Sequence, residues 1–200
     1  GKHTLRSAVY DGAMQPYEIG EYPVTNGEFT RFLSASGYVP KDRTRFLAQW
    51  SEELRSESIE DDPVTNVTLE DAWAYAEWCG ARLPTVEEAL YAVARESTAR
   101  GATRASERSV AIPGGAAARY RAGDVWELSA SEYTDDHTRF VLLTGGSSFR
   151  AEGAPWYFDG GRLPDDWIAK MIRFSPAIDR SDTVGFRIAR TTVGNNTAER

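Results

Sequence analysis

Aromatic rings and charged side chains crowd into the segment between residues 147 and 183 of this 200-residue chain. Rigid rings combined with fork-shaped cations are typical of surfaces that bind a ligand or a partner protein. The composition equally fits rings that cover a sheet and charges that solvate its rim, so both interpretations stay open. The candidate ligand-binding residues are Arg150, Trp156, Tyr157, Phe158, Asp159, Trp167, Lys170 and Arg173.

Two other groups have the side-chain types of metal or thiol sites. Asp135, Asp136 and His137 are consecutive, and such side chains can ligate a hard or borderline metal ion. Consecutive residues in a turn rarely point to one centre, so we expect a solvated hairpin turn instead. The single cysteine, Cys79, excludes an intramolecular disulfide and any multi-thiolate metal site. We expect it to pack as a small buried hydrophobic residue.

The elements that must position these side chains begin with helices whose starts are marked by capping boxes. In such a box a Ser or Thr is followed three residues later by an acidic side chain. Gly37 and Gly80 stand where the first two helices are expected to end. The boxes pair Thr25 with Glu28, Thr68 with Asp71, and Thr85 with Glu88.

The second of these helices is predicted to bury one apolar stripe, because hydrophobic side chains recur along it at helical spacing. This is the strongest local signal in the chain. The stripe consists of Leu69, Ala72, Trp73, Ala76 and Cys79.

Outside the helices the patterns are weaker. PVTN occurs at residues 23–26 and 63–66, and we interpret it as a shared extended approach to a helix rather than a duplication. Residues 41–62 are charged and predict a solvated connection or a loosely docked helix. Residues 97–119 are rich in Ala, Arg, Ser and Gly, which predicts a mobile loop. Short strands follow, and the alternation in residues 184–189 predicts a half-buried strand.

The overall composition is that of a soluble globular protein, with 41% hydrophobic and 12% aromatic residues. A net charge of -7 repels phosphate backbones, so nucleic acid is not an expected partner. The sequence contains no run of about 18 apolar residues, which a membrane-spanning helix would need. No apolar targeting segment is visible near the first residue, and the sequence does not indicate a compartment.

The order of motifs resembles the formylglycine-generating enzyme and sulfatase-modifying-factor family. The motifs are PVTN before a helix, PVTNVTLEDAWAYAEWCGARLPTVEEALYAVAR, GDVWELS, TGGSSFR and VGFRIAR, which cover about residues 17–190. The resemblance implies an α+β fold of the C-type-lectin kind, with two main helices packed on small antiparallel sheets and much irregular structure. It implies a single domain over residues 1–192, with residues 193–200 as a C-terminal tail.

The resemblance also implies that the family's cysteine chemistry is lost. The founding enzyme binds copper(I) through two cysteines shortly after the GGS motif and oxidises a substrate cysteine. The corresponding positions here are Arg150 and Pro155, which offer none of the soft ligands that copper(I) selects. Another branch of the family makes carbon-sulfur bonds with a histidine-ligated iron. His3 and His137 are the only histidines in this chain and cannot supply a three-histidine site.

Family members hold structural calcium near the motif that corresponds to GDVWEL. Gly123, Val125 and Glu127 are present here and form a candidate calcium site. Tyr120 stands where a carboxamide or carboxylate ligand is usual, which weakens that site. We expect Glu127 instead to accept hydrogen bonds from backbone amides or an arginine, with Arg187 as the candidate partner. No other cofactor is expected.

Two hypotheses for the function follow. The first is a non-catalytic, lectin-like module that binds a protein, glycan or small molecule through residues 147–183. It is favoured because no nucleophile with an adjacent base can be named. The alternative is an enzyme of the family with non-thiol chemistry, such as an oxidoreductase, in the same pocket. The pocket candidates are Ser147, Arg150, Asp159, Lys170 and Asp179.

Overall fold

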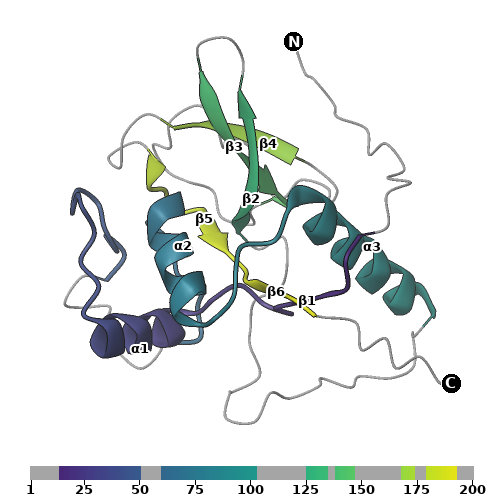
Figure 1. Cartoon of the computed structure of the whole chain (residues 1–200), viewed down its shortest axis with the longest axis horizontal. Coiled ribbons are helices and arrows are strands. Elements are labelled where there is room, and N and C mark those ends of the chain that lie inside the picture. Colours follow the sequence, from purple (N-terminus) through teal and green to yellow (C-terminus); the bar gives the residue numbers. More distant parts are fainter. Residues whose placement is uncertain are drawn as a thin grey trace, which may run out of the picture.

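The computed structural model combines helices and short strands in an α+β arrangement (Figure 1). Among the described residues it has three α-helices and six β-strands, and none of the helices is long and apolar enough to cross a lipid bilayer. For residues 95–102 only the backbone is described. The described residues are 14–50, 60–102, 125–134, 138–146, 168–173 and 179–192.

Each helix begins immediately after a predicted cap. In α1 and α2 both hydrogen bonds of the capping box are present, and the Thr85 and Glu88 pair makes the same two bonds at the start of α3. Gly37 and Gly80 follow α1 and α2 in the left-handed conformation, as predicted. The helices are α1 (Asn26–Ser36), α2 (Leu69–Trp78) and α3 (Val86–Ala102).

Two predictions about these helices need correction. α3 continues through residues 97–102, where a loop was expected, because Ala and Arg are strong helix formers even without an apolar period. Residues 103–119 of that expected loop lie outside the described residues. Trp73 was expected in the buried stripe of α2, but 40% of it is exposed, while Tyr75 is buried. Leu69, Ala72 and Ala76 of the predicted stripe are buried, so the buried face of α2 is shifted toward Tyr75 and away from Trp73.

The strands form two sheets. β1 and β6 pair antiparallel, and the second sheet has the order β4-β3-β2-β5. The predicted antiparallel pairing is found for β2 with β3 and for β3 with β4, but β5 runs parallel to β2. The strands are β1 (Tyr17–Ile19), β2 (Trp126–Thr134), β3 (Arg139–Thr144), β4 (Ile168–Ile172), β5 (Val184–Phe186) and β6 (Ala189–Thr191).

The single half-buried strand expected over residues 184–189 is divided between two sheets. β5 ends at Phe186 and pairs with β2, whereas β6 begins at Ala189 and pairs with β1. Gly185 and Arg187 are buried together with Val184 and Phe186, whereas Ile188 is only partly buried, so both faces of β5 are covered. The alternating pattern was therefore misread, because the buried charge of Arg187 is matched by a partner from elsewhere in the fold.

The two PVTN segments lie side by side; Asn26 already begins α1, and Asn66 has a left-handed backbone. Val64 donates its backbone amide to the carbonyl of Val24 at 2.8 Å, and Thr25 forms an antiparallel bridge with Pro63. Val24 in turn donates to Phe186 at 2.9 Å, which joins the pair to β5. Each segment thus leads into a helix from the centre of the fold, in agreement with our interpretation of the motif.

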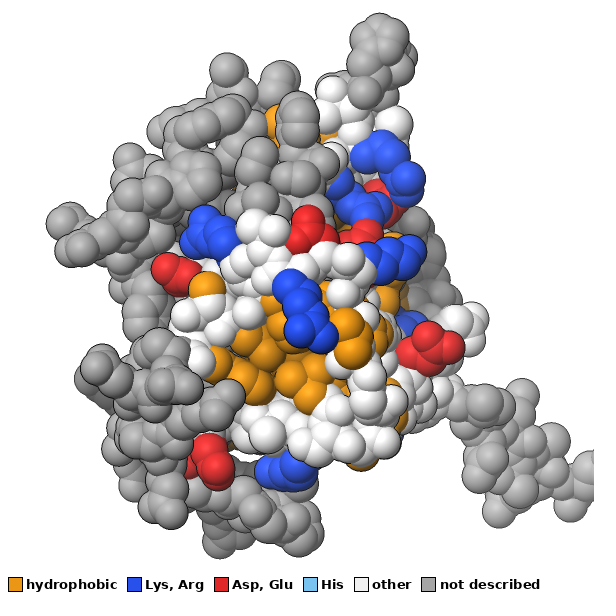
Figure 2. All heavy atoms as spheres, turned by 90° about the vertical axis from the view of Figure 1, so that its left-hand side faces the viewer, with side chains coloured by type: hydrophobic (Ala, Val, Ile, Leu, Met, Phe, Trp, Pro, Cys, Tyr) orange, Lys and Arg blue, Asp and Glu red, His pale blue; other side chains and the backbone are white. Residues whose placement is uncertain are grey.

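An aromatic cluster forms the core between α1, α2 and β5. The rings of Phe29 and Tyr75 stack at 5.7 Å, and the Phe186 ring lies edge-on to both. Phe46 and Trp50 are partly buried against the core from the segment that follows α1. Figure 2 views the side of the molecule that carries α1 and this segment, and apolar side chains gather near the middle of that face.

Candidate functional site

The segment predicted to bind a ligand lies partly outside the described residues. Lys170 on β4, Arg173 just after it and Asp179 are described, and all three are partly exposed. The remaining candidates outside the described residues are Gly123, Ser147, Arg150, Trp156, Tyr157, Phe158, Asp159 and Trp167. The predicted hairpin turn with Asp135, Asp136 and His137 also lies outside.

Lys170 lies over an aromatic surface on the four-stranded sheet. Its Nζ is 3.5 Å from the centroid of the Tyr133 ring and 5.9 Å from that of Phe140. An ammonium over a ring face is attracted by the negative charge of the π-system. The Tyr133 ring, from β2, remains 43% exposed. The sheet thus presents a positioned cation beside an accessible ring.

Arg173 is held by carboxylates from two elements. It donates to Glu132 on β2 at 2.9 Å and to Glu70 on α2, so its guanidinium connects the helix to the sheet. Glu132 also accepts from Arg139 at 2.7 Å, and this hydrogen bond is the main cause that lowers the pKa of Glu132 below its ordinary value. Lys170 and Arg173 therefore lie close along the chain but have different partners.

Glu127 and Arg187 form a buried ion pair, which confirms the predicted partner. The guanidinium Nε lies 2.6 Å from the carboxylate, and both side chains are almost fully buried. Arg187 also donates to the carbonyl of Gly20 at 3.3 Å. A calcium ion beside Glu127 would meet the positive charge of Arg187, and Gly123 lies outside the described residues, so the calcium site stays a prediction. The described parts of the chain also contain no group of three His, Cys, Asp or Glu side chains placed to hold a metal ion.

The structure contains a second buried ion pair that was not predicted from the sequence. Arg180 donates to Asp71 at 2.9 Å, and both side chains are only 1% exposed. Arg180 also donates to the carbonyls of Asp42 and Thr44, and the Tyr38 hydroxyl donates to Asp71 at 2.8 Å. Burial, together with this hydrogen bond, raises the pKa of Tyr38. Asp71 carried a capping signal, but nothing local marked Arg180 as its partner.

Cys79 caps the C-terminus of α2 and packs against the core, but it is only partly buried. Burial raises the pKa of the Cys79 thiol above its ordinary value, which disfavours the nucleophilic thiolate. The packing role predicted for it is supported, although full burial is not.

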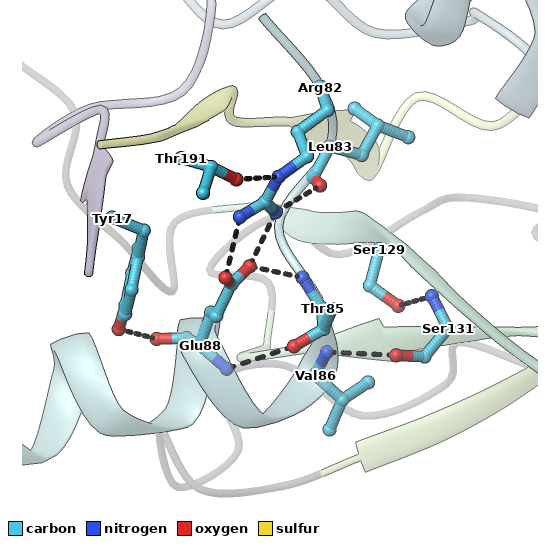
Figure 3. A network of polar contacts seen from close by, with 9 residues as sticks. All are labelled: Tyr17, Arg82, Leu83, Thr85, Val86, Glu88, Ser129, Ser131 and Thr191. Atoms are coloured by element: carbon cyan, nitrogen blue, oxygen red, sulfur yellow. Dashed lines mark hydrogen bonds and ion pairs between the residues drawn. The ribbon is translucent and has the colours of Figure 1, made fainter. Parts of the chain in front are cut away.

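A groove of about 620 Å³ lies between α2, the start of α3 and β6. Arg82 forms its polar floor by donating to both carboxylate oxygens of Glu88 at 2.7 Å and to Thr191 at 3.0 Å (Figure 3). Tyr17 of β1 donates its hydroxyl to the Glu88 carbonyl at 2.8 Å. Burial acts to raise the pKa of Glu88, but hydrogen bonds from Arg82 and the Thr85 amide outweigh it, so the pKa is lowered.

The helices and curled sheets form an α+β domain, and the family match places it in the C-type-lectin-like fold, as predicted. Residues 3–111 match the family model described as the sulfatase-modifying factor enzyme 1-like domain, and the chain belongs to this family.

Two relatives show how far the likeness extends. The chain is 30% identical over 161 residues to a protein named hercynine oxygenase from Mycolicibacterium smegmatis, covering 58% of this chain. It is 31% identical over 125 residues to a protein named formylglycine-generating enzyme from Streptomyces coelicolor, covering 45% of this chain. The matches span 37% of the length of each relative.

Proposed function

We propose that this chain is a non-catalytic binding domain of its family. Its ligand surface would be formed by residues 147–183, which include β4. The observation that carries the proposal is the position of Lys170 over the exposed ring of Tyr133. A ring fixed on a strand can stack against an apolar ligand face, while the ammonium can pair with an acidic group. A protein or glycan with an acidic group beside an apolar face fits this surface.

The number and position of cysteines favour a binding role over the copper-dependent oxidation that the family's founding enzyme carries out with two cysteines. Copper(I) selects soft thiolate ligands, and this sequence has one cysteine. Cys79 lies at the end of α2 with a raised pKa, and Arg150 and Pro155 occupy the positions that correspond to the family's cysteine pair. A paired-thiolate site therefore cannot be assembled from these residues.

Arrays of glycans and acidic peptides would test the binding role. We expect a ligand whose affinity falls roughly two- to tenfold in Tyr133→Leu and in Lys170→Gln, since cation–π and aromatic contacts at exposed sites have that strength. Tyr91→Leu is the matched control, because Tyr91 is a similarly exposed tyrosine on α3. Ligands that bind the unmodified chain and all three variants with equal affinity would show that this surface is not the binding site.

The similarity to two proteins named as enzymes supports a second candidate, a family enzyme with non-thiol chemistry. Elemental analysis of the purified chain and mass spectrometry of hercynine or a cysteine peptide after incubation would decide between the two. We expect no conversion. A stoichiometric transition metal with substrate turnover, or a peptide thiol converted to an aldehyde, would overturn the binding proposal.

A further inference from the structure

The groove between α2 and α3 is also lined by a tryptophan that takes no part in the hydrogen bonds between Arg82 and Glu88. Trp73 is 40% exposed and lines the groove. Glu77 lies one turn further along α2, so the indole and the carboxylate share one side of the helix. Met14 and Ala81, which are partly exposed, extend the apolar surface beside them. An accessible indole next to a carboxylate is a combination that attracts organic cations.

The charge of the groove is negative. Arg82 and Glu88 neutralise each other through their double hydrogen bond and add no net charge. Glu77 and Glu87 are exposed and line the groove from different helices, and neither forms an ion pair with any other described residue. Glu87 also lies in the first turn of α3, where the helix dipole favours a carboxylate. Glu77 has no such local reason and is the more informative of the two.

We propose that this groove binds a basic segment of a partner protein, with a lysine or arginine side chain over Trp73 and in contact with Glu77 or Glu87. The groove is open to solvent and its volume exceeds that of a single side chain, so an extended peptide fits better than a fully enclosed small cation. The aliphatic stem of the basic residue would pack on the apolar wall while its charge meets the carboxylates. None of the lining residues lies between 147 and 183, so this groove is separate from the ligand surface proposed above.

Fluorescence anisotropy of a labelled peptide of alternating lysine and alanine tests the proposal. We expect Trp73→Leu and Glu77→Gln each to weaken binding roughly two- to fivefold, the strength of such contacts at exposed positions. Trp73→Tyr keeps a ring and should retain most of the affinity. Added salt should weaken the interaction, because it screens exposed charges. Glu60→Gln, an exposed carboxylate whose backbone contacts the start of α1, is the matched control and should not change binding.

Several outcomes would overturn the proposal. Affinity unchanged in both Trp73→Leu and Glu77→Gln would place the peptide elsewhere. An equal loss in Glu60→Gln would mean general attraction to a chain of net charge -7. Equal binding of a peptide with glutamate in place of lysine would exclude charge recognition. Sedimentation of the chain alone would reveal a dimer if a second copy fills the groove, and a dimer that Trp73→Leu dissociates would replace the partner proposed here. Thermal melting of each variant confirms that it is folded.

Discussion

Arg180 and Arg187 are the largest fully buried side chains among the described residues, and each is neutralised by a carboxylate distant in sequence. Arg187 pairs with Glu127 of β2, and Arg180 pairs with Asp71 of α2. A buried charge is costly unless an opposite charge and hydrogen bonds surround it. These pairs therefore fix the C-terminal segment in one position against the helix and the sheet.

Arg187→Met should destabilise the domain by about 3–5 kcal/mol, because it leaves the Glu127 carboxylate buried without its counter-charge. Urea unfolding followed by circular dichroism measures the change. The double variant Glu127→Leu with Arg187→Met removes both charges and should be more stable than the single variant. A loss below about 1 kcal/mol in the single variant would show that solvent or another group compensates the carboxylate.

Glu88 makes stability depend on pH in the acidic range. Its pKa is held below its ordinary value of 4.5 in the folded state, so the folded state binds a proton less readily than the unfolded state. The stabilisation is fully present above pH 4.5 and is lost as the pH falls through the folded-state pKa. Glu88→Gln should therefore lose about 1 kcal/mol at neutral pH and progressively less in acid, as measured by urea unfolding at several pH values. A constant difference across this range would contradict the assignment.

At the scale of the elements, the helix starts were predictable because a capping box uses only residues three apart. The ends at Gly37 and Gly80 were equally local, since left-handed backbone favours glycine. The buried face of α2 could not be predicted from local sequence alone, because helical spacing is compatible with more than one apolar stripe. Tyr75 packs against Phe29 and Phe186, and this packing leaves Trp73 exposed.

The candidate site was less predictable than the fold. Lys170 was singled out by composition, but its neighbour Tyr133 was not, because cross-strand contacts depend on register. The partner of Glu127 could be proposed because the family resemblance placed both residues in motifs. Arg180 had no such signal, since its carboxylate lies 109 positions away in the sequence. Contacts between distant segments require the three-dimensional arrangement.

The capping boxes of α1 and α2 should respond differently to substitution. Within the described parts of the chain, the Glu28 carboxylate accepts a hydrogen bond only from the Thr25 amide, whereas the buried Asp71 carboxylate also accepts from Tyr38 and Arg180. Glu28→Gln should therefore cost less than about 1 kcal/mol, and Asp71→Asn about 3 kcal/mol. Urea unfolding of the two variants gives the comparison. Equal losses would mean that the extra partners of Asp71 contribute little.

At the scale of the whole molecule, distant parts of the chain meet around two strands near its end. β1 pairs with β6, and the second PVTN segment approaches β5 closely at Gly185. A Cβ atom at Gly185 would lie 2.9 Å from the carbonyl oxygen of Val64 and 3.1 Å from a methyl group of Val125. Glycine is required there by this close approach of three segments and not by an unusual backbone angle.

Gly185→Ala should destabilise the domain by about 2–3 kcal/mol, because the backbone of the second PVTN segment must shift to admit the methyl group. Gly37→Ala is the matched control: its backbone has φ 65 and its Cβ would meet nothing within 4 Å, so only the left-handed conformation is penalised, by about 1 kcal/mol. Urea unfolding with both variants separates the two causes. If Gly185→Ala were no more costly than Gly37→Ala, the three segments would have room to move apart, and the centre of the fold would be looser than its hydrogen bonds imply.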